Sequence, residues 1–245
     1  MRVATRRARA VLRVARPLLD AEWADHLRTE LKWLGNSLGQ VRDLDVLIAH
    51  LREEATSLGD EDGFAAQRIV HALEGEREHA RGALIEALES ERYSKLRERL
   101  AQADRASLGE DPGVTLSDLA ATEFGKLRKA GRSLDGSSSD ADLHRVRVKA
   151  KRARYAAELA EPLAGKPAIR FIKKAKRFQD IVGGHQDAVV AEQRIRAVVG
   201  STRASKVAFA AGRLVERERE IRRDARKAMP KAWAALERAG RKAWS

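Results

Sequence analysis

The sequence contains no cysteine, little proline and few aromatic residues, and each scarcity excludes a class of protein. Without cysteine in 245 residues, disulfide scaffolds and thiolate metal sites are excluded, and a reducing cytoplasm is the expected location. Aromatic residues make up only 4% of the chain. This disfavours readers of single-stranded nucleic acid, because such proteins stack bases on aromatic rings.

Long apolar runs are also lacking. No run approaches the roughly 18 residues that span a bilayer, so we do not expect membrane insertion. The basic first residues, MRVATRRARAVLRV, lack the uninterrupted apolar core and small-residue cleavage site of a secretory signal.

Basic residues, in contrast, are abundant. The 49 Lys and Arg residues exceed the 36 Asp and Glu residues and give a net charge of +13. This excess indicates a polyanionic partner, such as a nucleic acid, an acidic membrane surface or a phosphate polymer. Ala, Leu, Arg and Glu dominate with helical spacing almost throughout, so the sequence predicts an all-α protein.

Glycine, proline and polar clusters divide this pattern into expected helices. The ranges are 2–16, 22–38, 42–58, 64–106 with a break near Ser90, 115–131, 140–164, 168–182, 186–199, 203–228 and a short helix from Pro230. Gly39 and Gly183–Gly184 are expected to break helices, residues 165–167 to form a turn, and Ser139 or Asp140 to cap a helix.

One stretch, 143–155, carries six Lys/Arg and one histidine but no acid. Read as a helix at about 100° per residue, it gathers four cationic groups in a sector of about 80°: His144, Arg147, Lys151 and Arg154. Apolar residues flank this sector on both sides: Leu143, Val146, Ala150, Ala153 and Ala157 on one, and Val148, Tyr155 and Leu159 on the other. The remaining basic residues point elsewhere, as a solvated face would: Arg145, Lys149 and Arg152. A helix packed on both flanks would line a groove with these charges, which is costly unless an anion fills the groove.

The chain also repeats itself. Residues 2–20 match residues 147–165, and residues 32–46 match residues 176–190, so that Gly39 pairs with Gly183 and Asp43 with Asp187. In the first copy, four arginines share a sector of about 60°: Arg2, Arg6, Arg9 and Arg13. Val3, Ala10 and Val14 flank it on one side, and Thr5 and Leu12 on the other. The sequence therefore predicts a tandem duplication of one helical unit, paired around a pseudo-twofold axis.

With this repeat, the string H-x-x-R-V-x-x-K-R-x-R at 144–154 resembles the CHAD domain, the conserved histidine α-helical domain. The matching segments are RVATRRARA with ARPLLD, LKWLGNSLGQVRDLDVL, LHRVRVKAKRARYAAEL and KRFQDIVGGHQDAVV. The resemblance implies one domain over 1–245, built from two four-helix bundles with a basic central groove. Its N-terminal half would be 1–133, its linker 134–139 and its C-terminal half 140–245.

The resemblance also implies a function. It implies binding of inorganic polyphosphate, association with polyphosphate granules, no enzymatic activity and no cofactor. The family motif places a histidine three residues before the first arginine of each repeat. His144 supplies it in the second copy, whereas the first copy would need it before Met1. We therefore expect the native chain to begin upstream of Met1, which mass spectrometry of the native N-terminus would test.

Several side chains are expected to contact the phosphates: Arg2, Arg6, Arg9, Arg13, Lys32, His144, Arg147, Lys151, Arg154, Lys174 and Lys176. The helix expected over 168–182 has a buried face formed by Ala168, Phe171, Ile172, Ala175, Phe178 and Val182. Lys174 and Lys176 border this face, whereas Lys173 and Arg177 point away from it. Lys32 aligns with Lys176 in the repeat. His144 could instead pack or cap a helix, or bind a metal. Asp43 and Asp187 could cap helix starts or orient arginines from behind.

Three other functions remain open. Charge alone does not exclude a nucleic-acid-binding protein using the same basic surface. A phosphate-processing enzyme would need metal-binding carboxylates in the groove, and none is predicted there, nor does a P-loop or nucleophile motif occur. The third is an adaptor, associated with polyphosphate or with a phosphate-processing enzyme, whose basic face binds an acidic protein.

Overall fold

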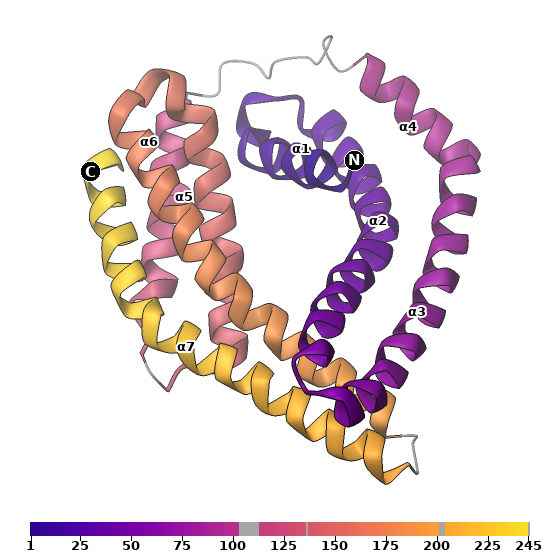
Figure 1. Ribbon diagram of the computed structural model, residues 1–245. Helices are drawn as coiled ribbons and strands as arrows, with labels where there is room; N and C mark the ends of the chain where they lie inside the picture. Colours follow the sequence, from indigo (N-terminus) through magenta and orange to yellow (C-terminus); the bar gives the residue numbers. More distant parts are fainter. Residues whose placement is uncertain (103–112, 136, 201–203, 245) are drawn as a thin grey trace.

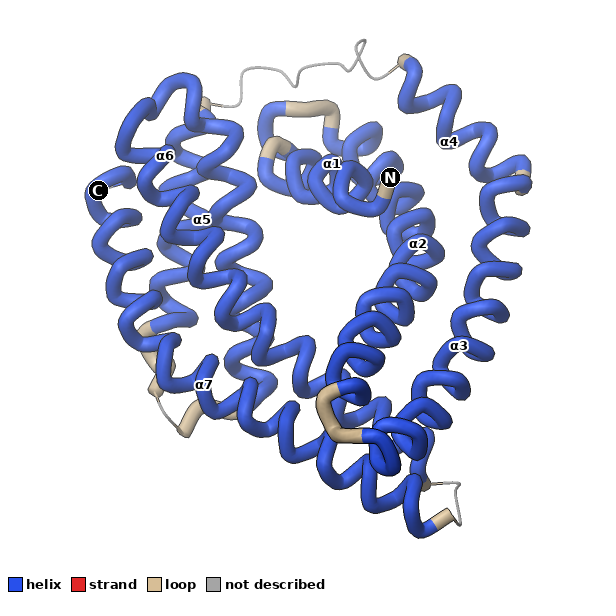
Figure 2. Tube along the Cα trace, in the orientation of Figure 1, coloured by secondary structure: helices blue, strands red, loops and turns tan. Residues whose placement is uncertain are grey.

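The computed structural model describes residues 1–102, 113–135, 137–200 and 204–244. The helices are α1 (Arg2–Val14), α2 (Ala21–Thr56), α3 (Asp60–Glu89), α4 (Glu91–Ala101), α5 (Leu116–Gly131), α6 (Asp140–Val199) and α7 (Ser205–Trp244), with a 3-10 turn, η1 (Arg16–Leu18), after α1. Within these described ranges there is no β-strand (Figure 2). The all-α prediction is therefore confirmed.

Two groups of helices meet along α7, which runs along the lower edge of the molecule (Figure 1). In the first group, α5, both parts of α6 and the C-terminal part of α7 enclose a core that contains Phe171 and Phe178. In the second, α2, α3, the end of α6 and the start of α7 enclose a core that contains Leu51, Leu73 and Leu214. The long helices α6 and α7 thus contribute to both cores and join the two groups.

Local signals place several helix boundaries where the sequence predicts them. Ser139 caps α6 through a reciprocal pair of hydrogen bonds with Asp142, and Ser90 separates α3 from α4 and caps the latter. Gly165 interrupts α6 with a non-helical backbone (φ 62°, ψ −141°), a conformation that glycine adopts without steric cost. The turn expected at 165–167 is confirmed, and it divides α6 into a first arm and a second arm.

Three expected breaks are wrong. Gly39 lies inside α2, Gly183 and Gly184 lie inside the second arm of α6, and Pro230 lies inside α7. A glycine inside a helix costs only about 1 kcal/mol relative to alanine, and packing of the flanking apolar faces offsets it. The long expected helix over 64–106 divides at Ser90, and α4 ends at Ala101; residues 103–112 lie outside the described ranges.

Most expected buried faces are confirmed. Leu27, Leu31 and Leu34 of α2 pack together with Leu12 of α1, and all six apolar residues expected on the buried face of 168–182 are buried. The described residues between α5 and α6, 132–135 and 137–139, are not helical, and α5 packs against both α6 and α7 through Phe124 and Leu127.

Candidate anion-binding site

Helix α1 bridges the two groups of helices and thereby orients its row of arginines. Leu12 packs against α2, while Val14 packs against Ala120 of α5 and Ala156 of α6. Thr5 is also buried, as expected, but Val3 is 68% exposed. The expected flank at Val3 is therefore wrong.

The first arm of α6 packs on both sides of its cationic row. Leu143, Val146, Ala150, Ala153 and Ala157 are all buried in the core with α5 and α7. On the other side Tyr155 is 5% exposed, and Val148 and Leu159 are half-buried. Arg147, Lys151 and Arg154 are consequently half-buried between two apolar flanks, whereas His144, near the start of the arm, is exposed.

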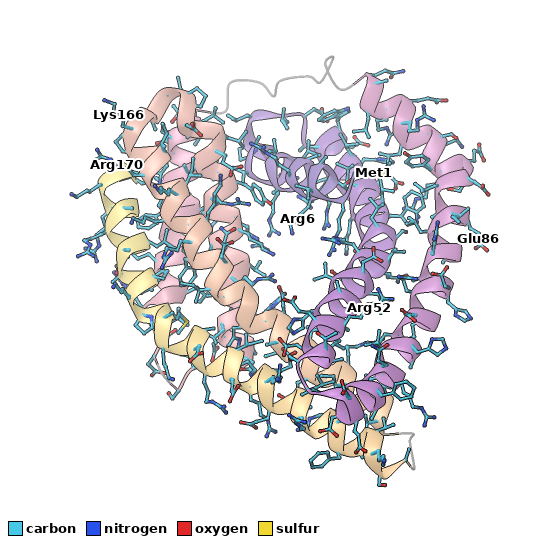
Figure 3. All side chains as sticks on the ribbon, in the orientation of Figure 1. Met1, Arg6, Arg52, Glu86, Lys166 and Arg170 are labelled. Carbon is cyan, nitrogen blue, oxygen red and sulfur yellow. The ribbon has the colours of Figure 1, made fainter. Side chains whose placement is uncertain are left out.

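Charges from α1 and α6 converge at Lys151. Burial lowers the pKa of its ammonium group to about 8, and the charges of Arg147, Arg6 and Arg154 add to this effect, while Asp187 opposes it. Arg6 belongs to α1, so the cationic rows of the two helices share one electrostatic environment. Figure 3 shows Arg6 pointing from α1 into the space that α1, α2 and α6 frame.

Two aspartates hold the first arginine of each row. Nη2 of Arg2 donates to Oδ1 of Asp43 at 2.6 Å, and Nη2 of Arg147 lies 3.6 Å from Oδ1 of Asp187. Both aspartates sit inside helices, so the expectation that they cap helix starts is wrong. Their contacts fit the alternative, in which each carboxylate orients an arginine.

Three buried guanidinium nitrogens lack a partner. The Nε atoms of Arg9, Arg147 and Arg154 are inaccessible to solvent and make no hydrogen bond within the described part of the chain. Burial also lowers the pKa of Arg9, and the charge of Arg28 lowers it further. The guanidinium groups lie against two helical glycines: a Cβ at Gly35 would lie 3.5 Å from Nη1 of Arg9 and one at Gly183 would lie 3.7 Å from Nη2 of Arg147, both ordinary van der Waals distances.

Glu158 is a member of this site that the sequence analysis missed. Its Oε2 atom lies 3.3 Å from Nη2 of Arg7 on α1, and its Oε1 atom lies 3.6 Å from Nη1 of Arg154. It therefore fastens α1 to the first arm of α6. The sequence feature that could have identified Glu158 is its position four residues after Arg154, which places it one helical turn further along the face that carries the cationic row.

The remaining expected residues lie at the margins. His144 faces Gln186 of the second arm, with 3.2 Å between its Nδ1 atom and Oε1 of the amide. Arg152 is half-buried rather than solvated, and burial followed by the charge of Arg13 lowers its pKa. Arg13 therefore lies near Arg152.

Lys32, Lys174 and Lys176 are exposed. No ion pair or hydrogen bond among the described residues joins these three lysines to the row on the first arm of α6. Their predicted phosphate contacts stay predictions. Over the same described ranges, no group of three histidine or acidic side chains could hold a metal ion, and no helix combines the length and apolarity that crossing a bilayer requires.

Comparison with known proteins places this arrangement in context. Two uncharacterized proteins of Mycobacterium tuberculosis, MT2285 of strain CDC 1551 and Rv2226 of strain H37Rv, are 29% and 28% identical over 99% of this chain. The chain spans only 48% of the length of each of these relatives.

Two solved structures share the fold. PptA from Streptomyces chartreusis aligns with a TM-score of 0.78 at 22% identity, over 95% of this chain and 87% of its own. The crystal structure of the CHAD domain from the plant Ricinus communis aligns with a TM-score of 0.70 at 25% identity, over 96% of this chain and 80% of its own. The family model of the CHAD domain matches residues 1–196, and the chain therefore belongs to the CHAD domain family.

Proposed function

We propose that this chain binds inorganic polyphosphate, without chemical conversion, through the basic side chains that α1 and α6 bring together. The observation that carries the proposal is the convergence at Lys151. Its half-buried ammonium group is surrounded by the charges of Arg6, Arg147 and Arg154, and the buried Nε atoms of two of these arginines have no partner in the described chain. Like charges clustered in this way favour a bound anion.

The residue types suit a chain of phosphates. Arginine forms two-pronged hydrogen bonds with phosphate oxygens, and lysine contributes a point charge. A polymer without bases needs no stacking platform, in agreement with the low aromatic content of 4%. Binding of this kind releases counterions and weakens steeply with salt.

A duplicated unit would supply two such surfaces. We place α1 and α2 in the first unit and the two arms of α6 in the second, with a basic groove between them. The pairs Arg2–Asp43 and Arg147–Asp187 support this assignment, because they occupy matching positions of the repeat and join equivalent helices. Within the groove, Arg6 would contact the same phosphates as Lys151. We place the protein in the cytoplasm, on polyphosphate granules.

Competition separates polyphosphate from nucleic acid as the ligand. A labelled DNA duplex is bound to the protein at moderate salt and challenged with polyphosphate at equal phosphate concentration. We expect polyphosphate to displace the duplex, because a flexible polymer reaches half-buried guanidinium groups that a rigid duplex cannot enter. Failure to displace it would contradict the proposal and favour a nucleic-acid-binding protein.

A second assay addresses catalysis. We expect no orthophosphate when the protein is incubated with polyphosphate and Mg²⁺. Release of orthophosphate in proportion to protein would contradict the non-catalytic part of the proposal.

A further inference from the structure

Lys151 differs from its neighbours on the first arm of α6 in having no carboxylate of its own. Arg147 is paired with Asp187 at 3.6 Å, and Arg154 with Glu158 at 3.6 Å. Lys151 lies between these two arginines along the same helical face, and no ion pair or hydrogen bond connects it to another described residue. It is half-buried, so its side chain is partly sheltered from bulk water and partly open to it.

Such an environment makes a lysine nucleophilic. A desolvated lysine beside other cations gives up its proton readily, and its neutral amine attacks carbonyl carbon. With a pKa of about 8, a substantial fraction of Lys151 is neutral near pH 7.5. The facing charges are Arg6 from α1, Arg147 and Arg154 from the same arm, and Asp187 from the second arm.

The same three arginines would hold the phosphate of a small electrophile beside this amine. Their guanidinium groups carry the hydrogen-bond donors that phosphate oxygens prefer, and the buried Nε atoms of Arg147 and Arg154 are unpartnered in the described chain. A phosphate seated there would place an attached acyl group within reach of Lys151.

We infer that Lys151 is a modification site, whose amine accepts an acyl group from an acyl phosphate held by Arg6, Arg147 and Arg154. The Nζ atom attacks the carbonyl carbon of the acyl group and forms an amide bond. The bond between that carbon and the bridging phosphate oxygen breaks, and inorganic phosphate leaves. The departing phosphate takes up the proton that the nitrogen loses and leaves as hydrogen phosphate, so atoms and charge balance, and no oxidant or reductant is needed.

Acylation would regulate the site. The amide is uncharged, so it removes one cation from the cluster and weakens its attraction for phosphate chains. This consequence rests on the proposed function, whereas the reactivity of Lys151 does not. Bound polyphosphate would in turn cover the amine and protect it.

The experiment uses acetyl phosphate as the acyl donor. The intact protein is incubated with it at pH 7.5, with and without polyphosphate, and acetylation of each lysine is followed by peptide mass spectrometry. Lys173, an exposed lysine on the second arm of α6, is the internal control. We expect Lys151 to react roughly tenfold faster, because its larger neutral fraction outweighs the lower nucleophilicity that accompanies a lower pKa.

Two further comparisons identify the cause. In Arg147→Ala, acetylation of Lys151 should slow several-fold while that of Lys173 stays unchanged, with circular dichroism confirming the fold. In the unaltered protein, polyphosphate should slow acetylation of Lys151 and not of Lys173. The second comparison needs no variant and so does not depend on the stability of Arg147→Ala.

The outcomes separate the two claims. Equal rates at Lys151 and Lys173, or an unchanged Lys151 rate in Arg147→Ala, would overturn the modification site even if polyphosphate binds as proposed. Selective acetylation of Lys151 that polyphosphate does not slow would support the modification site and count against the proposed function.

Discussion

Oε1 of Glu218 on α7 lies 2.6 Å from Nε2 of His50 on α2. Glu218 is fully buried at 0% exposure, and its second oxygen makes no hydrogen bond within the described residues. His50 is therefore the group that compensates a buried carboxylate beside the core that α2 and α7 share. Removing one partner of a buried pair leaves an uncompensated charge, which destabilises proteins by several kcal/mol.

This pair predicts a pH-dependent stability. The hydrogen bond with Glu218 raises the pKa of His50 despite the opposing effect of burial. Because the folded pKa lies above the unfolded value, the stabilisation is complete below about pH 6.5 and is lost as pH rises through the raised folded pKa. Lys151, whose pKa is lowered to about 8, contributes a change of the opposite sign over the same interval. The effect of His50 is therefore measured as a difference: the free energy of unfolding of the unaltered protein relative to that of Glu218→Gln should be lower at pH 9 than at pH 6.

A substitution at the same pair checks the cause. His50→Ala should lower the free energy of unfolding at pH 6 by about 3 kcal/mol. Glu218→Gln removes the buried carboxylate and with it the contribution of His50 to the pH dependence, so from pH 6 to pH 9 its free energy of unfolding should fall less, or rise more, than that of the unaltered protein. An identical pH dependence in Glu218→Gln and the unaltered protein would show that another group is responsible.

Helices α5 and α7 pack so closely that two glycines are required between them. A Cβ at Gly131 would lie 2.0 Å from the ring of Trp233, and one at Gly240 would lie 2.1 Å from the ring of Phe124. Gly131→Ala should lower the free energy of unfolding by about 1–3 kcal/mol, the usual range for overpacking a core.

Gly125 provides a matched control on α5. It is exposed, and a Cβ there would meet nothing within 4 Å. Gly125→Ala should therefore stabilise the protein by up to about 1 kcal/mol through helix propensity. Equal effects of the two substitutions in thermal unfolding would contradict the close packing at Gly131.

Polyphosphate affinity should depend on pH through Lys151. With a pKa of about 8, this group loses its charge as pH rises, and binding of an anion favours the protonated form. We expect the affinity to fall several-fold between pH 7.5 and 9.5 at constant salt. Lys151→Arg, whose side chain stays charged, should show a flatter profile, and a profile unchanged from that of the unaltered protein would contradict the role of Lys151.

Glu158 should oppose anion binding. Its carboxylate lies within 3.3–3.6 Å of guanidinium nitrogens of Arg7 and Arg154 and partly neutralises them. Glu158→Gln should therefore raise the polyphosphate affinity several-fold in an equilibrium titration. Glu86→Gln on α3 is the control, because it changes the net charge equally and Glu86 points outward, away from α1 (Figure 3); it should have little effect. A similar gain in affinity in both variants would show that only the overall charge matters.

Local patterns were sufficient to predict some parts of the structure. The buried stripe from Leu143 to Ala157, the cap at Ser139 and the turn at Gly165 each depend on residues close together in sequence. The cationic row His144, Arg147, Lys151 and Arg154 follows from helical spacing alone, since its apolar flanks fix which face is buried.

Features that depend on a distant helix could not be predicted in this way. Gly39 and Gly183 continue their helices because tertiary packing outweighs a small propensity penalty. Arg152 is half-buried, and Arg13 at the end of α1 lies close enough for its charge to lower the pKa of Arg152 beyond the effect of burial. Glu158 joins α1 to α6 because it also pairs with Arg7 of α1. Its sequence spacing from Arg154 could indicate only the pair within α6.

The central claim is that Arg147 and Lys151 bind polyphosphate, and an equilibrium titration tests it most directly. Arg147→Ala/Lys151→Ala is compared with Lys173→Ala/Arg177→Ala, which removes the same two charges from exposed positions of α6, and circular dichroism verifies both folds. We predict that the first variant loses affinity roughly tenfold or more, and that the slope of log affinity against log salt concentration becomes shallower by about two, one for each lost phosphate contact. The second variant should change little in both quantities. Unchanged affinity in Arg147→Ala/Lys151→Ala, or an equal loss in both variants, would contradict the account.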